Sequence, residues 1–389
     1  MTQPGAVRKA LQVGALYAGG FLGPFGGGVV AAMLPEIGAD LGVSTNAAST
    51  SLTAYLLPFA AVMLVSGTLG ARWGRVRTVR LAYAVYIVAS IGCVLAPTLP
   101  ILLGARILQG CANAFTTPLL LSALAALTPK RRLGRVLGTF GALQAAGQTS
   151  APLIGGLAAE VDWRLAFGSI AVVAAVLGAI GLPTSVAAIP TDDTARLREA
   201  LRLDVVRVGI IALLGWGALG GLNFLLAFRA EDAFGLGPTS RGLLLTCFGI
   251  AGILTARPVG AVIDAMGARR AVILGAIVGG ALVAVVGTAG LLIVTAAAWA
   301  LAGVAAQFVL VGVNAAVLGS QGANRSGAVS VVQSFRFTGA AIAPLLLTPV
   351  YEVHQVLAFV VPAALLAVSA PLVMPGSRGK RRKTDNADG

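Results

Sequence analysis

The stretch GTLGARWGRVRTVR, residues 67–80, holds four arginines and no acidic residue. Gly67, Gly70 and Gly74 lie among the arginines, and a long apolar run stands on each side of the stretch. Short basic loops between apolar runs are typical of the cytoplasmic side of a membrane protein. A basic cluster could also contact nucleic acid, so the rest of the chain has to decide between these two interpretations.

The composition of the chain favours the membrane interpretation. Of its 389 residues, 57% are hydrophobic and only 11% are charged. A soluble globular domain carries about 25% charged residues. In a bilayer, an α-helix satisfies its own backbone polar groups, so nearly every side chain can be apolar. We therefore expect an all-α integral membrane protein.

Apolar runs of about 20 residues recur along the chain and predict twelve transmembrane helices. We expect them at 11–34, 48–70, 79–97, 100–127, 136–158, 164–186, 206–229, 239–263, 271–289, 291–318, 326–350 and 354–374. The expected domains are an N-terminal six-helix bundle (1–186), a cytoplasmic linker (187–205), a C-terminal six-helix bundle (206–374) and a basic cytoplasmic tail (375–389).

The positive charges predict the orientation of the chain. Most of the 28 lysines and arginines fall in alternate loops and in the two terminal segments. Because cytoplasmic loops retain positive charge, this pattern predicts a multi-pass protein of the cell inner (plasma) membrane with both termini in the cytoplasm. It also explains the net charge of +14 without a nucleic-acid partner.

The two halves of the sequence repeat each other. Residues of the opening stretch and of the fourth expected span recur in the second half at one constant offset, and residues of the fifth span recur at an offset shorter by one position. The pairs are Gly67 and Gly260, Gly74 and Gly267, Arg77 and Arg270, Gly110 and Gly303, Phe115 and Phe308, Gly147 and Gly339, and Pro152 and Pro344. This agreement predicts two bundles of related structure.

Several motifs resemble those of the major facilitator superfamily. Residues 67–79 resemble the family's loop signature between spans 2 and 3, and RILQGCANA (106–114) resembles its span-4 signature. GALQAAGQTSAPLIGG (141–156) resembles the span-5 signature of the 12-span drug:proton antiporters, the multidrug efflux proteins. The resemblance covers the whole chain, and it implies the major facilitator fold with a substrate path between the halves near the middle of the membrane.

The resemblance also implies an inner gate at the cytoplasmic end. Its residues here are Gly67, Gly70, Arg72, Gly74, Arg75, Arg77, Arg257, Gly260, Asp264, Gly267 and Arg270. The family pattern has an aspartate where this chain has Ala71, whereas the equivalent position of the second half carries Asp264. Our hypothesis is that the charge lock of this gate operates mainly through Asp264.

Span 5 carries a cluster of small residues and one proline: Gly147, Pro152, Gly155 and Gly156. Small residues let helix backbones approach closely, and proline bends a helix. The cluster predicts a hinge on which span 5 pivots during alternating access. Close helix packing without a pivot is the alternative.

Arg106 lies within span 4, where a cation costs about 2.5–3.5 kcal/mol on insertion scales. The resemblance implies a role for Arg106, with Gln109, in proton coupling; a structural anchor to backbone carbonyls is the alternative. None of the 14 acidic residues falls in the middle of an expected span, and Gly26 or Gly27 replaces an acid that many relatives carry in span 1. The nearest candidates for a coupling group are therefore Glu36, Asp40 and Asp264, together with the lone His354 in the last outer loop.

Polar residues within the expected spans are candidates for the substrate cavity, because intramembrane amides and cations face partners rather than lipid. They are Tyr17, Asn113, Gln144, Gln148, Asn223, Gln307, Asn314, Gln333 and Arg336. Hydrogen bonding between helices is the alternative for each. A cavity with cations and amides but no carboxylate favours neutral, amphipathic or anionic substrates over permanent cations.

These observations predict a secondary active transporter that exports small amphipathic compounds by alternating access and proton antiport. A carrier for one metabolite or nutrient, with export or uptake, is the alternative. We expect no enzyme, because the chain has one histidine, no intramembrane acid pair and no cluster of metal ligands. The expected partners are a small-molecule substrate and the lipid bilayer, with no metal, no cofactor besides the proton gradient, and a monomeric state.

Overall fold

The computed structural model describes residues 4–129, 132–183, 202–318 and 325–375, and it is all-helical over these residues. The N-terminal half comprises α1 (Pro4–Gly28), the 3₁₀ segment η1 (Val29–Ala32), α2 (Leu34–Asp40), α3 (Thr45–Arg72), α4 (Arg75–Val94), α5 (Leu99–Ala126), α6 (Leu133–Ala159) and α7 (Arg164–Ile180). The C-terminal half comprises α9 (Leu203–Ala218), the 3₁₀ segment η4 (Gly220–Leu222), α10 (Asn223–Asp232), α11 (Pro238–Met266), α12 (Ala268–Thr288), α13 (Leu292–Leu318), α14 (Arg325–Val353) and α15 (Gln355–Val373).

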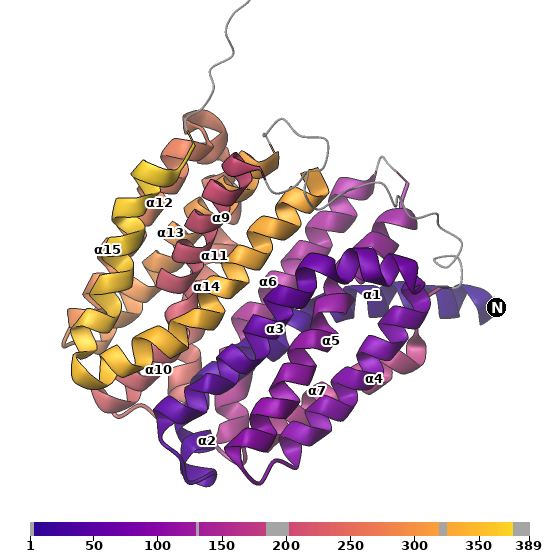
Figure 1. Ribbon diagram of the computed structural model, residues 1–389, viewed down its shortest axis with the longest axis horizontal. Helices are drawn as coiled ribbons and strands as arrows, with labels where there is room; N and C mark the ends of the chain where they lie inside the picture. Colours follow the sequence, from indigo (N-terminus) through magenta and orange to yellow (C-terminus); the bar gives the residue numbers. More distant parts are fainter. Residues whose placement is uncertain (1–3, 130–131, 184–201, 319–324, 376–389) are drawn as a thin grey trace, which may run out of the picture.

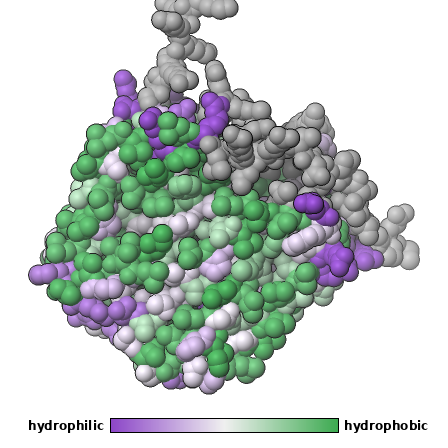
Figure 2. Space-filling view, in the orientation of Figure 1, coloured by the Kyte–Doolittle hydropathy of each residue, from purple (hydrophilic) through white to green (hydrophobic). Residues whose placement is uncertain are grey.

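The predicted fold class is confirmed. Ten helical segments among the described residues are long and apolar enough to cross a membrane, and α7 is a shorter apolar helix. The helices form two bundles side by side, and the visible face is covered largely by apolar side chains (Figures 1 and 2). The expected linker and tail lie outside the described residues from 187 to 201 and from 376 to 389.

The first span of each half is broken, which hydropathy did not predict. The expected span 11–34 is α1 followed by η1 and the start of α2, and the expected span 206–229 is α9, η4 and α10. The breaks fall at equivalent positions, because Gly28 and Gly220 are related by the same offset as the fifth span and its repeat. Short 3₁₀ segments inside long helices are often found at functional hinges.

The internal repeat also holds at the level of helix contacts. A Cβ atom on Gly110 would overlap the carbonyl oxygen of Tyr55, and one on Gly303 would overlap that of Phe248. Tyr55 and Phe248 are themselves equivalent residues of the repeat. In the same way Gly147 abuts the carbonyl of Phe21, and its equivalent Gly339 abuts the carbonyl of Leu213. Glycine is therefore required at these positions because two helix backbones touch there.

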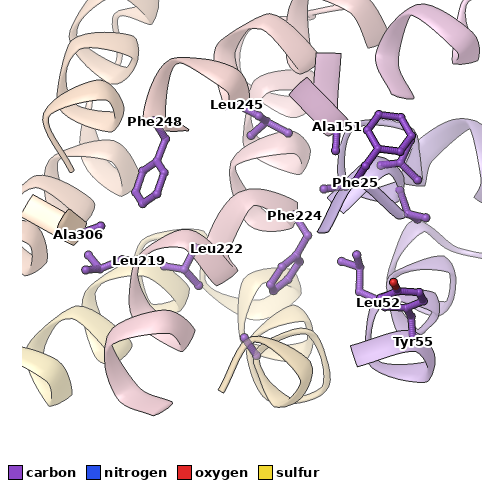
Figure 3. Packing of buried hydrophobic residues seen from close by; sticks show 14 of the residues in the cluster. Phe25, Leu52, Tyr55, Ala151, Leu219, Leu222, Phe224, Leu245, Phe248 and Ala306 are labelled. Atoms are coloured by element: carbon purple, nitrogen blue, oxygen red, sulfur yellow. The ribbon is translucent and has the colours of Figure 1, made fainter. Parts of the chain in front are cut away.

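The two halves share one buried apolar core. Phe248, Leu219 and Leu222 contribute from the C-terminal half, and Tyr55 and Leu52 contribute from the N-terminal half (Figure 3). Between the halves, α3 packs against α14, and α6 packs against α11. These four helices therefore define the plane in which any site between the bundles has to lie.

Candidate functional site

The two ends of the molecule differ in charge, and we name them accordingly. The basic end holds the α3–α4 and α11–α12 turns with Arg72, Arg77 and Arg270; the acidic end holds α2, the α6–α7 turn and the end of α10. At both turns of the basic end a glycine has a positive φ, 88° at Gly74 and 85° at Gly267. Only glycine adopts this conformation without strain, which explains two glycines of the repeated motif.

Polar contacts between the halves run from the acidic end to the middle of the helices. Thr53 Oγ1 donates to the carbonyl of Ala341 at 2.5 Å, and Ser334 Oγ donates to the carbonyl of Ala60 at 2.7 Å. Closer to the acidic end, Ser49 Oγ lies 3.3 Å from Thr348 Oγ1. Over the described residues, no comparable bond joins the halves at the basic end.

An ion-pair cluster around Arg241 joins the halves at the acidic end. Arg241 of α11 is 2% exposed and forms an ion pair with Glu36 of α2. Its Nη1 lies 3.2 Å from Glu231 Oε2, and its Nε donates to the carbonyl of Ala32 at 3.3 Å. Glu36, one of the predicted coupling carboxylates, is thus half of an ion pair between the halves.

A neighbouring contact involves Glu160, which follows α6. The backbone N–H of Thr239 donates to Glu160 Oε1 at 3.1 Å and lowers the pKa of this carboxyl below its usual value. Glu160 is therefore ionised at neutral pH, and its bond across the interface is lost only as the pH falls through the lowered pKa.

The predicted span-5 hinge lies between α1 and α11. A Cβ on Gly155 would overlap the carbonyl of Val29, and one on Gly156 would overlap the carbonyl of Pro238 in the other half. On the opposite side, Gly242 of α11 abuts the carbonyl of Pro152. The small residues of α6 thus permit close packing both within the N-terminal half and between the halves. Whether α6 pivots there stays a prediction.

Arg336 of α14 lies at the centre of this interface. Its guanidinium carbon is 3.6 Å from the ring centroid of Trp216 on α9. Its Nη1 donates to Gln333 Oε1 at 3.2 Å, and its Nη2 lies 3.5 Å from Gln148 Oε1 on α6. Three of the predicted cavity residues, Gln148, Gln333 and Arg336, are therefore together, and they come from both halves.

A pocket opens beside Arg336 within the C-terminal half. Its polar members are Asn314, Gln333 and Arg336, which were predicted as cavity residues. Its apolar members are Ala212, Trp216, Val309, Leu310, Val313 and Val332. The pocket has a volume of only about 10 Å³, enough for about one water molecule, so an organic ligand requires the surrounding helices to separate.

Arg106 of α5 occupies a different environment, wholly inside the N-terminal half. It is 0% exposed, its Nη1 donates to the carbonyl of Gly26 at 2.9 Å, and its Nε donates to the carbonyl of Ser51 at 3.3 Å. Its Nη1 also donates to Gln109 Oε1 at 2.8 Å, and its guanidinium carbon lies 4.3 Å from the Tyr55 ring centroid. The anchor to backbone carbonyls is therefore present; a part in proton coupling stays a prediction.

Asn113 also serves helix packing. Its Nδ2 donates to Tyr55 Oη at 2.7 Å and to the carbonyl of Gly23 at 3.2 Å, and only 3% of the residue is exposed. Nearby, a Cβ on Gly26 would overlap the hydroxyl of Tyr86. The tyrosine hydroxyl thus fills the space in which an acidic side chain at this position of α1 would begin.

The remaining cavity candidates are dispersed. Tyr17 on α1 and Gln144 on α6 are half-buried. Asn223 begins α10, where its Oδ1 is buried without a hydrogen-bond partner among the described residues. Gln307 packs its amide against Gly252 and so joins α13 to α11. The structure does not bring these four residues to the guanidinium of Arg336.

The predicted inner-gate residues lie at the basic end. Arg72, Arg77, Arg257 and Asp264 are exposed, and no described residue forms an ion pair with Asp264. The bonds described between the halves lie instead at the acidic end and in the middle of the helices. The role of Asp264 stays a hypothesis.

Two residues of the site, Arg241 and Trp216, are not among those predicted from the sequence. An arginine just inside an apolar helix, with acids near the ends of other spans, is a signal for a buried ion pair and could have identified Arg241. A tryptophan in an apolar run does not reveal which side chain it stacks on, so the sequence carries no comparable signal for Trp216.

Comparisons with known proteins agree with this architecture. The sequence model of the Major Facilitator Superfamily matches residues 16–237 and again residues 208–389. The chain is 34% identical over 163 residues to the uncharacterised MFS-type transporter Rv1250 of Mycobacterium tuberculosis. The aligned region covers 42% of this chain and 28% of that protein. It is 30% identical over 191 residues to the methylenomycin A resistance protein of Streptomyces coelicolor. That aligned region covers 47% of this chain and 39% of the resistance protein.

The chain thus matches about a third of the length of these curated relatives. Among solved structures, a POT family transporter in complex with 5-aminolevulinic acid superposes with a TM-score of 0.79, over 93% of this chain and 95% of that one. The sequence identity in that pair is 13%, so the likeness concerns the fold alone.

Proposed function

The chain belongs to the Major Facilitator Superfamily, and from this premise we propose that it is a secondary transporter that exports small amphipathic compounds by alternating access. The observation that carries the proposal is the position of Arg336. It lies beside a largely apolar pocket, and it contacts Trp216, Gln333 and Gln148, the last of which belongs to the opposite half. A group bound there would touch both halves and could be passed from one side of the membrane to the other.

The likeness to a resistance protein supports export as the direction. In the proposed orientation the basic end faces the cytoplasm of the cell, both termini are cytoplasmic, and the acidic end faces outward. The described conformation is then closed outside, with the Glu36–Arg241 ion pair as part of the closure.

Proton antiport is the proposed energy source, with Glu36 as its carboxylate. Glu36 forms an ion pair with Arg241 of the other half while the acidic end is closed, so opening that end has to separate the carboxylate from the arginine. Glu36 therefore changes its surroundings between the two conformations, which a coupling group has to do.

The proposal is tested by expression in a bacterium that lacks its own efflux pumps. We expect resistance to several unrelated amphipathic compounds and faster loss of a preloaded dye, compared with cells that carry the Arg336→Gln variant. Resistance to none of the compounds, together with gradient-driven movement of one metabolite, would replace this function by a dedicated metabolite carrier.

A further inference from the structure

Arg336 is a cation without a counter-ion in the middle of the protein. The described acidic residues lie at or beyond the ends of helices, and none of them forms an ion pair with Arg336. Its hydrogen-bond acceptors are two neutral amide oxygens, and its Nε is buried with no partner among the described residues. A buried charge is normally paired, because desolvation of an unpaired ion is costly.

The contrast with Arg106 shows which cation is available to a ligand. Arg106 also has one buried nitrogen, Nη2, without a partner among the described residues, but it is 0% exposed and bonded to two backbone carbonyls of its own half, so a ligand cannot reach it. Arg336 is only partly buried, and it faces a pocket and the opposite half. Arginine also presents a planar fork that matches a carboxylate in two hydrogen bonds.

The surroundings of the guanidinium fit the rest of such a ligand. Trp216 covers one face of the guanidinium at 3.6 Å and holds the group against the pocket wall. Val309, Val313 and Val332 offer an apolar surface next to it, while Asn314 and Gln333 can donate amide N–H groups. The chemistry of this lining therefore matches a molecule with one anionic group and an apolar body, which would enter when the helices around the pocket separate during the transport cycle.

We propose that the substrate itself is the counter-ion of Arg336: the pocket binds amphipathic monoanions, such as aromatic or medium-chain carboxylates, through the Arg336 guanidinium. This inference rests on the proposed function and narrows its substrate class. Gln148, from the opposite half, completes the site, so the anion contacts both bundles. An empty carrier then holds an unpaired cation between the halves, and a loaded carrier holds a neutral pair.

The test measures binding to the purified full-length protein in neutral detergent at pH 7.5. The probes are benzoate, 2-naphthoate and octanoate, each compared with its own primary amide, which has the same shape and no charge. We expect at least one carboxylate to bind about 10- to 100-fold more tightly than its amide, as for a charge-assisted hydrogen bond in a partly buried site. No preference for any of the three carboxylates would overturn the proposal.

Three variants assign the preference to the site. Arg336→Gln should bring the affinities for acid and amide within twofold of each other, and retained amide binding shows that this variant is folded. Gln148→Glu, which places a carboxylate beside the guanidinium, should abolish the preference by supplying the missing counter-ion within the protein. Arg80→Gln, at an exposed arginine of α4, is the matched control and should leave the preference unchanged.

The anion preference is contradicted if Arg336→Gln or Gln148→Glu retains it, or if Arg80→Gln removes it. Transport assays on the same proteins separate this inference from the proposed function. Anion binding without transport would contradict the function and leave the site intact. Transport of neutral amphipathic compounds without any preference for anions would contradict the site and leave the function intact.

Discussion

The two intramembrane arginines show how neighbouring atoms decide what a charged residue can do. Arg106 is bonded to the carbonyls of Gly26 and Ser51 and to Gln109, and its guanidinium packs on Tyr55. These bonds tie α5 to α1 and α3. The fixed groups around Arg106 therefore make it part of the packing of the N-terminal half, whereas Arg336 lies between the halves beside a small pocket.

Replacing Arg106 by glutamine should destabilise the protein. The variant leaves two buried carbonyl oxygens without their charged donor, at a cost of about 2–4 kcal/mol. Thermal unfolding in detergent should show a lowered midpoint, whereas Arg80→Gln at an exposed site should change the stability by less than about 0.5 kcal/mol. An unchanged midpoint for Arg106→Gln would mean that these hydrogen bonds are not an anchor.

At the scale of elements, glycine positions determine how the helices meet. Gly147 abuts the Phe21 carbonyl on α1, whereas a Cβ on Gly141, on the same helix, would have no atom within 4 Å. The repeat preserves the first of these contacts at Gly339 and Leu213. Position on the helix, and not glycine content as such, therefore decides which glycines matter.

Gly147→Ala and Gly141→Ala form a matched pair for this claim. Alanine at 147 has to push α6 away from α1, and we expect a loss of about 1–3 kcal/mol in stability, as for overpacked cores. Alanine at 141 should be neutral or slightly stabilising, because alanine favours helix over glycine by about 0.5–1 kcal/mol. Equal melting points for the two variants would refute the packing role of Gly147.

Much of this architecture could be predicted from the sequence. Hydropathy located the apolar helices, because an apolar run is a local property of neighbouring residues. The nearly constant offset between paired residues identified the two halves, because the same residue types recur at equivalent positions. The breaks at Gly28 and Gly220 could not be predicted, because the chain has 51 glycines and the apolar runs continue through both breaks.

The sequence could predict which polar residues are candidates for the site, but it could not predict most of the contacts between them. Arg336 lies one helical turn after Gln333, so their contact follows from helical spacing. The stacking on Trp216 and the ion pair between Arg241 and Glu36 join residues that are far apart in the sequence. Such contacts depend on how whole helices are placed, which no local pattern in the chain encodes.

At the scale of the whole molecule, the bonds described between the two halves lie at the acidic end and in the middle of the helices. The described bonds between them extend from the Arg241 cluster to Ser334 and Ala60. In alternating access, these bonds have to break when the acidic end opens and the basic end closes. The Glu36–Arg241 ion pair should then favour the described conformation over the alternative.

Glu36→Gln should shift the population toward the conformation that is open at the acidic end. Loss of one charge-assisted bond worth about 1.5–3 kcal/mol corresponds to a shift of about 10- to 100-fold. The shift is measured as the rate at which a membrane-impermeant maleimide labels Ser49→Cys, a position buried against Thr348, in a chain without native cysteines.

Asp40→Asn is the control for this experiment. Asp40 pairs with Arg164 at 2.6 Å, at the same end of the molecule but within one half. Its loss should leave the labelling rate at position 49 unchanged. Equal labelling of the Glu36→Gln variant and the unmodified background, or equal acceleration by both variants, would show that the ion pair between the halves does not control the opening.

The energetics of export follow from the substrate class. If the cargo is an anion, its outward movement is favoured by an inside-negative potential, by about 2.3 kcal/mol per 100 mV for one charge. Proton antiport adds a second driving force of the same direction. A carrier of this kind, without a mid-membrane carboxylate among its described residues, therefore has two possible sources of energy, the membrane potential and the proton gradient. The contributions of the two have to be separated by measurement.

The central claim, export of amphipathic compounds in exchange for protons, is tested most directly by the purified protein in liposomes with a pH gradient and a membrane potential clamped to zero. A pH-sensitive dye in the lumen reports proton movement, and labelled compound reports transport in the opposite direction. The account predicts that protons leave the lumen as the compound enters it, and that Arg336→Gln abolishes both movements. Compound flux that leaves the luminal pH unchanged would contradict proton antiport, and no flux of any amphipathic compound would contradict the transport function itself.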